Sequence, residues 1–165
     1  TETTAAILQL LRRVRDEFRL TVLLITHELS AVQATCDRVA VLDAGQLVEH
    51  GDVVDVFLRP QHAATRAMLS ESGMQGSDDW RTLAERLPGW LLRLSYEGDT
   101  IAQPMLSRLS RELRLDLSIL QGSVGTIKTT PYGQLVVAAD GAPADLQAML
   151  PTLDAAGIHY EVLRS

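Results

Sequence analysis

Hydrophobic side chains recur at two different spacings in the first part of this 165-residue chain. In residues 2–18 they return every three or four positions, which predicts an amphipathic helix. Residues 21–26 are instead a continuous β-branched and aliphatic run, typical of a parallel strand buried on both faces. The apolar stripe of the predicted helix consists of Ile7, Leu10, Leu11, Val14 and Phe18.

The following segment, up to about residue 69, is predicted to contain a hairpin and three short helices. The hairpin strands are residues 38–43 and 46–50, and Ala44-Gly45 supplies the turn. The predicted helices are residues 29–35, 52–58 and 63–69.

A change of composition after Leu69 indicates a second domain. Residues 70–79 are polar and rich in Gly and Ser, which favours a linker. We therefore divide the chain into a first domain at 1–71, a linker at 72–88 and a second domain at 89–165. The second domain alternates in the order βαββαβ, which is the ferredoxin-like pattern. Its predicted strands are 90–96, 115–124, 134–140 and 158–163, its helices 104–114 and 142–156, and residues 125–133 a loop.

Charge and cysteine content narrow the functional classes. The formal net charge is −6. Lys128 is the one lysine, and the arginines are scattered, so no basic patch for nucleic acid is expected. Cys36 has no partner for a disulfide and none at metal-ligand spacing, which fits a reducing compartment. No metal site, secretory signal or membrane-spanning run is predicted.

Two strings in the first domain resemble the end of an ABC transporter ATPase domain. They are Leu-Ile-Thr-His-Glu-Leu at 24–29 and Cys-Asp-Arg-Val-Ala-Val-Leu-Asp-Ala-Gly-Gln-Leu-Val-Glu-His-Gly at 36–51. In that family the histidine after this strand is the switch histidine. The resemblance implies that His27 has this catalytic role in a longer parent subunit, where it would position the attacking water or the γ-phosphate. The alternative for His27 is an ordinary histidine at a strand end. The resemblance also implies a fragment of a RecA-like α/β domain.

The sequence lacks the residues that would hold ATP. No G-x-x-x-x-G-K-[ST] phosphate loop occurs, and no apolar run ends in the acidic pair that would serve Mg²⁺ and water. Because phosphoryl transfer needs that electrostatic cradle, we expect no catalysis and no cofactor for this chain alone. ATP and Mg²⁺ are expected in the parent, a transporter ATPase peripheral to the cytoplasmic face of the membrane and bound to a transmembrane permease.

The second domain resembles the NIL regulatory domain of methionine-importer ATPases. The strings that carry the resemblance are residues 92–98, 104–107, 117–122, 133–137 and 158–163. The resemblance implies that two such domains pair as a homodimer, and that L-methionine or a similar amino acid binds between them and inhibits transport. The ligand-binding residues that it implies are Met105, Ser118, Ile119 and Leu120.

Departures and alternatives remain at these positions. The family tends to have Asn near the position of Ser118, and a hydroxyl lacks the two-sided hydrogen bonding of an amide. Ile119 and Leu120 also fit an edge strand and core, and Met105 also fits a gap-filling core residue. The alternative function is a stand-alone amino-acid-binding or dimerisation module without enzymatic activity. RNA binding is not favoured, because the predicted strand 134–140 carries no aromatic residue for base stacking.

Overall fold

The computed structural model describes residues 2–72 and 79–165, and for residues 2–5 it describes the backbone. These residues fall into two compact units that meet between Met68 and Leu69. Each unit has its own sheet.

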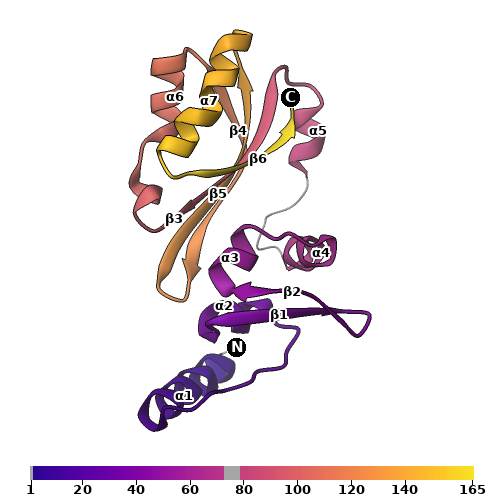
Figure 1. Ribbon diagram of the computed structural model, residues 1–165, viewed down its shortest axis with the longest axis vertical. Coiled ribbons are helices and arrows are strands. Elements are labelled where there is room, and N and C mark those ends of the chain that lie inside the picture. Colours follow the sequence, from indigo (N-terminus) through magenta and orange to yellow (C-terminus); the bar gives the residue numbers. More distant parts are fainter. Residues whose placement is uncertain (1, 73–78) are drawn as a thin grey trace. The chain divides into compact units, whose positions relative to one another are not determined.

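The first unit combines helices with a two-stranded antiparallel hairpin (Figure 1). The hairpin turn lies at Ala44 and Gly45, which both have positive φ (48° and 79°). Asp52 then caps the next helix, because its carboxylate accepts a 2.9 Å hydrogen bond from the Val54 N–H. The elements are α1 (Glu2–Phe18), α2 (Leu29–Thr35), β1 (Arg38–Asp43), β2 (Gln46–Asp52) and α3 (Val53–Leu58). Helix α4 (Ala63–Glu71) contains the boundary between the two units.

The predicted parallel strand at 21–26 is wrong for this structure. These residues form no regular element, and the Leu23 and Ile25 side chains are 86% and 89% exposed. A parallel strand needs a hydrogen-bonded neighbour and helices over both faces. Among the described residues, the only strands of the first unit are β1 and β2, and these pair with each other.

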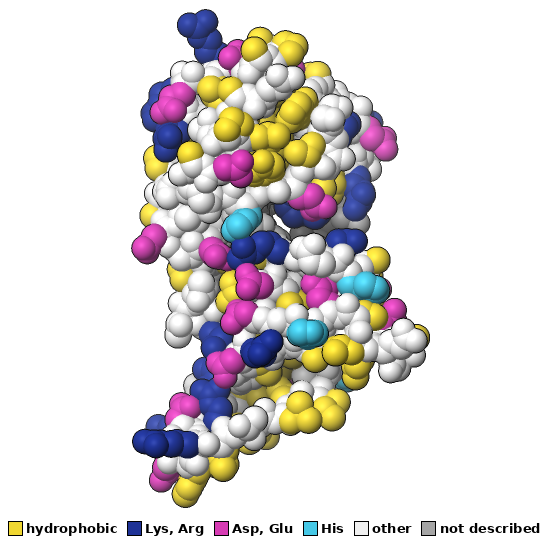
Figure 2. Space-filling view, viewed as in Figure 1, with side chains coloured by type: hydrophobic (Ala, Val, Ile, Leu, Met, Phe, Trp, Pro, Cys, Tyr) yellow, Lys and Arg dark blue, Asp and Glu magenta, His cyan; other side chains and the backbone are white. Residues whose placement is uncertain are grey.

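The predicted helix α1 is present, but its apolar stripe is not covered. Ile7, Leu10 and Phe18 are 54%, 61% and 63% exposed. Figure 2 shows hydrophobic side chains on the surface of the part of the molecule where Figure 1 places α1. The amphipathic pattern therefore predicts the helix correctly. However, the described residues do not cover its apolar face.

The second unit is a four-stranded antiparallel sheet with strand order β4-β5-β3-β6. With the helices in sequence this is the βαββαβ ferredoxin-like fold, as the sequence predicted. A short 3-10 helix, η1 (Gly98–Ala102), follows the first of these strands. The other elements are α5 (Trp80–Ala84), β3 (Trp90–Glu97), α6 (Met105–Leu113), β4 (Asp116–Ile127), β5 (Thr130–Asp140), α7 (Pro143–Ala155) and β6 (His159–Arg164).

The sheet carries a separate apolar cluster on each face. Helices α6 and α7 cover one face, and α5 lies on the other (Figure 1). The larger cluster includes Leu92, Leu94, Met105, Leu109, Val137 and Leu153, all 1% exposed or less. The smaller cluster is built from Trp80 and Ala84 of α5 against Leu91, Val136 and Ala138 of the sheet. Residues 80–84 fall in the predicted linker, and they pack as part of the second unit.

The predicted loop at 125–133 is also wrong. Strand β4 continues to Ile127 and β5 begins at Thr130, so these residues form a tight hairpin around Lys128. Lys128 takes a positive φ of 59°, which permits the reversal. Gly125, Pro131 and Gly133 suggest a loop by composition. However, the intervening residues are mostly β-branched, and Pro131 pairs with Thr126 near the end of the ladder, where proline is tolerated.

Candidate ligand-binding site

The second unit contains a surface cavity of about 260 Å³ on the same face of the sheet as α6. Its walls come from three places: the strands β3, β4 and β5, the 3-10 helix η1, and the first turn of α6. The lining is mostly apolar, which is typical of sites for small organic ligands. The lining residues are Tyr96, Ile101, Gln103, Pro104, Met105, Leu106, Ser107, Val124, Gly133 and Leu135.

Tyr96 contributes a largely buried aromatic side chain to the wall of this cavity. It lies near the end of β3, opposite Gly133 of β5, and is 6% exposed. Within the described residues the hydroxyl of Tyr96 makes no hydrogen bond, and it is not one of the buried polar atoms that lack a partner, so it reaches solvent. Burial raises the pKa of Tyr96 to about 12, so the phenol remains neutral and able to donate at physiological pH.

The turn that leads into α6 is fixed by backbone hydrogen bonds. Glu97 donates its N–H to the Thr100 hydroxyl at 2.9 Å, and that hydroxyl donates back to the Glu97 carbonyl at 2.8 Å. The N–H of Gln103 donates to the Thr100 carbonyl at 3.0 Å. Pro104 then occupies the N-cap of α6, and its side chain provides no capping acceptor.

Of the four predicted ligand-binding residues, Met105 is the one that lines the cavity. Met105 is 1% exposed and also belongs to the larger apolar cluster, so it contributes both to the cavity wall and to the core. Ser118, Ile119 and Leu120 lie on β4, the edge strand, and do not line the cavity. Leu120 packs toward the α5 cluster on the other face, while Ile119 and Ser118 are exposed.

A β-bulge between Ile119 and Gln121 accounts for the position of Ser118 and Leu120 on the face away from the cavity. Before the bulge Ile119 pairs with Val137, and after it Gln121 pairs with Val136. Leu120 is the extra residue, so the alternation of side chains shifts by one position along β4. As a result Val124, further along the strand, lies at the cavity and is 78% exposed.

The sequence reasoning missed most of the cavity lining. Val124, Leu135 and Tyr96 lie in predicted strands, but neither the pattern nor the resemblance gives them a ligand role. The signal that was available is the alternation along β3 and β5, which places Tyr96 and Leu135 on the face covered by α6. The shift at the bulge, by contrast, cannot be read from the sequence pattern.

His27, the predicted catalytic residue, does not line the cavity. It is exposed, in a bend between residues 21–26 and α2. Next to it, the Glu28 N–H donates to the Thr26 hydroxyl at 2.9 Å, which shapes the entry into α2. Across residues 2–72 and 79–165, no group of three or more His, Cys, Asp or Glu residues is placed to hold a metal ion.

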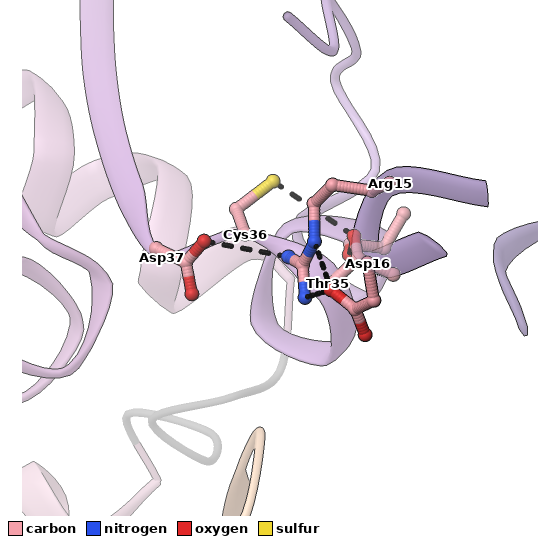
Figure 3. A network of polar contacts seen from close by, with 6 residues as sticks. Arg15, Asp16, Thr35, Cys36 and Asp37 are labelled. Atoms are coloured by element: carbon pink, nitrogen blue, oxygen red, sulfur yellow. Dashed lines mark hydrogen bonds and ion pairs between the residues drawn. The ribbon is translucent and has the colours of Figure 1, made fainter. Parts of the chain in front are cut away.

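A separate polar network in the first unit involves Arg15, Asp16 and Asp37 (Figure 3). Arg15 of α1 donates to Asp16 at 2.9 Å and to Asp37, just before β1, at 3.4 Å. The hydrogen bond and charge of Asp16 raise the pKa of Arg15. The Asp37 carboxylate is 63% exposed, so this pair ties α1 to the hairpin weakly.

The comparisons by family model and by sequence agree with the resemblance. The NIL domain family matches residues 90–162. Over 163 residues, 99% of the chain, it is 45% identical to "Methionine import ATP-binding protein MetN 2" of Pseudomonas aeruginosa and 44% identical to "Methionine import ATP-binding protein MetN 1" of Pseudomonas syringae pv. syringae. A crystal structure of the C-terminal domain of an ABC transporter ATP-binding protein from Enterococcus faecalis aligns with a TM-score of 0.44 at 24% identity, over 50% of this chain and 92% of that one.

The second unit is thus a NIL domain, of ferredoxin-like fold. The whole chain is homologous to methionine import ATP-binding proteins, which confirms the family recognised from the sequence. The chain spans about half the length of these relatives, since the match covers 48% of each. No helix in the described part of the chain is long and apolar enough to cross a membrane.

Proposed function

We propose that this chain is the C-terminal part of the ATP-binding subunit of a methionine importer, and that its NIL domain binds L-methionine and thereby inhibits transport. The parent subunit would bind ATP and Mg²⁺ and work with a transmembrane permease at the cytoplasmic face of the membrane. His27 would act there as the switch histidine. The kinship with methionine import ATP-binding proteins supports the transporter part of this proposal.

The observation that carries the sensing part is the cavity beside Tyr96. Its volume of about 260 Å³ lies below the roughly 300–1,000 Å³ of sites for drug-sized molecules, so it suits a ligand of amino-acid size. Ile101, Leu135 and the Met105 side chain give it apolar walls. An unbranched thioether can fill such a slot, while polar groups at one end hold the rest of the ligand.

The edge strand β4 supports pairing of two NIL domains. β4 hydrogen-bonds to β5 on one side, and its other edge is not paired within the described chain. Ile119 and Val124 are exposed on it, and residues 116–127 include no Lys or Pro that would hinder pairing. A two-fold seam along β4 would bring Ser118 of each copy to the other copy's edge, beside the mouth of the cavity at Val124.

The test of this function is the ATP turnover of the longer subunit assembled with its permease. We expect millimolar L-methionine to lower turnover, and removal of residues 79–165 to abolish that inhibition while turnover persists. A matched variant, Ile119→Lys, places a charge on the exposed edge strand outside the cavity lining, and it should weaken pairing of the NIL domains and reduce inhibition. Turnover that is insensitive to methionine in the intact complex would reject the sensing role. The domain would then be a dimerisation module, the second candidate, which the unpaired β4 edge favours.

A further inference from the structure

The carboxylate of Glu49 in β2 joins the hairpin of the first unit to the start of α4. One of its oxygens accepts a hydrogen bond from the Gln61 N–H at 2.8 Å, and the other accepts one from the His62 N–H at 3.0 Å. Backbone donors at the start of a helix have no partner within the helix, and a negative charge there is favourable. The contact spans 12 and 13 residues of sequence, so it ties α4 to a strand.

The turn before α4 is also held by a local contact. The Arg66 guanidinium donates to the carbonyl oxygens of Pro60 and Gln61, both at 3.0 Å. These bonds fold the turn against its own helix, within six residues of sequence. The bonds of Glu49, by contrast, decide where this folded turn is placed relative to the hairpin.

The environment of Glu49 keeps its carboxylate charged. Burial acts to raise the pKa of Glu49, but the Gln61 N–H, the nearby Thr65 hydroxyl and the His62 N–H outweigh burial, so the pKa lies below its ordinary value. Hydrogen bonds to a charged acceptor are stronger than those between neutral groups. The contact between β2 and α4 is therefore a firm one at neutral pH.

Helix α4 is the element that both units share. It runs without interruption from Ala63 to Glu71, and the boundary between the units falls within it, between Met68 and Leu69. A rigid secondary element of this kind can carry a displacement from one end to the other. The hairpin at its anchored end follows α2, which begins shortly after His27.

We propose that Glu49 is a positioning residue that couples the NIL domain to the ATPase part of the parent subunit. Because Glu49 fixes the start of α4 to the hairpin, a change of state in the NIL domain passes through α4 to the first unit and is not absorbed by a loose joint. This inference rests on the proposed function, and it names the residue through which inhibition reaches the first unit. Glu49 itself touches neither ligand nor nucleotide in this account.

The deciding experiment is the ATP turnover of the longer subunit, assembled with its permease, over a titration with L-methionine. We expect Glu49→Ala to raise the methionine concentration for half-inhibition by about fivefold or more, the lower end of typical allosteric couplings. Turnover without methionine should stay near that of the unmodified complex. Calorimetry on the 165-residue chain should show unchanged methionine affinity, because Glu49 does not line the NIL cavity. A merely structural role would lower turnover and leave the methionine response as it is.

Asp52→Ala is the matched control. Asp52 lies in the same strand, and its carboxylate caps α3 through the Val54 N–H at 2.9 Å. The variant therefore loses a helix cap of the same chemistry from a helix that lies within the first unit. We expect it to leave the methionine response unchanged. Glu49→Gln is the second variant, for the case that Glu49→Ala does not assemble. It keeps one acceptor oxygen and sets an NH₂ group against the other N–H, so it should give a smaller rise in the same direction.

The outcomes separate the two proposals. Inhibition at the same methionine concentration in both Glu49 variants, or an equal rise in Asp52→Ala, overturns the coupling role while methionine sensing stands. If the unmodified complex is insensitive to methionine, the proposed sensing function fails, and the coupling role falls with it.

Discussion

The guanidinium of Arg164 in β6 donates a hydrogen bond to the Ala84 carbonyl, 80 residues earlier in the chain, at 2.8 Å. The same side chain also donates to the carbonyl oxygens of Leu87 and Gly89, at 2.7 and 3.3 Å. These three acceptors lie at and after the end of α5, where helix carbonyls have no partner within the helix. Arg164 therefore fastens α5 and the turn after it to the sheet.

We predict that Arg164→Ala lowers the free energy of unfolding of the second unit by about 1.5–3 kcal/mol, because partly buried carbonyls lose a charged donor. Urea denaturation followed by the fluorescence of Trp80 and Trp90, both in this unit, would measure this. Arg108→Ala is a suitable control. Its ion pair with Glu112 is exposed, so its loss should cost about 0.5 kcal/mol or less. Equal effects of the two substitutions would contradict the role assigned to Arg164.

Gly89 precedes β3 with a φ of +80°, and a Cβ added there would lie 2.1 Å from the Ala139 carbonyl oxygen. We expect Gly89→Ala to destabilise the second unit by about 2 kcal/mol or more, since both the left-handed conformation and the clash act against it. Gly157→Ala, with φ +69° and open space around the added atom, isolates the conformational part and should cost about 1 kcal/mol. Thermal melting of both variants would show whether this order holds.

In contrast to the substitutions of Arg164 and Gly89, removal of the Tyr96 hydroxyl is predicted to have little effect on stability. Because this hydroxyl reaches solvent and makes no hydrogen bond within the described residues, we expect Tyr96→Phe to change the free energy of unfolding of the ligand-free chain by about 1 kcal/mol or less. A fall of more than 1 kcal/mol in unfolding free energy would show that the hydroxyl has a structural partner.

The same residue predicts a dependence of stability on alkaline pH. Burial raises the Tyr96 pKa from 10 to about 12, so the unfolded chain releases this proton first. The stabilising contribution is complete below pH 10 and is lost as pH rises through about 12. The loss should amount to about 1–2 kcal/mol, reduced by the contact of the hydroxyl with the open cavity. Chemical denaturation between pH 9 and 12 should show a shallower decline for Tyr96→Phe.

His27 can be tested only in the longer ATP-binding subunit. There we expect His27→Ala to abolish ATP turnover while ATP binding is largely retained, because a positioning histidine acts on the reaction and not on nucleotide affinity. Parallel measurements of phosphate release and nucleotide binding would separate the two effects. Near-normal turnover would mean that His27 is an ordinary exposed histidine.

The local sequence pattern predicts where helices and strands begin and end better than it predicts which of their side chains are buried. The helices α1, α2 and α7 and the strand β3 lie within a residue or two of the predicted bounds, because periodicity and end signals such as Gly157 are local. The strand expected at 21–26 depended on neighbours that the described residues do not supply. The same dependence explains why Ile7 and Leu10 face solvent.

The candidate site was less predictable for a related reason. Met105 was singled out through a family resemblance, and it does line the cavity. Ser118 and Leu120 were singled out in the same way, but the bulge beside Leu120 separates their side chains from that cavity. A bulge changes which face a side chain takes without changing composition, so the sequence pattern alone does not reveal it.

The most direct test of the account is a two-dimensional NMR titration of the full chain with L-methionine. We predict saturable shifts of the backbone amides of Leu106, Ser107 and Gly133 around the cavity, with further shifts along β4 if the domains pair there. The amides of the first unit, such as Val54 and Gln61, should stay unchanged. The absence of saturable shifts at millimolar methionine, or shifts confined to residues away from the cavity, would contradict the proposal that this NIL domain senses methionine.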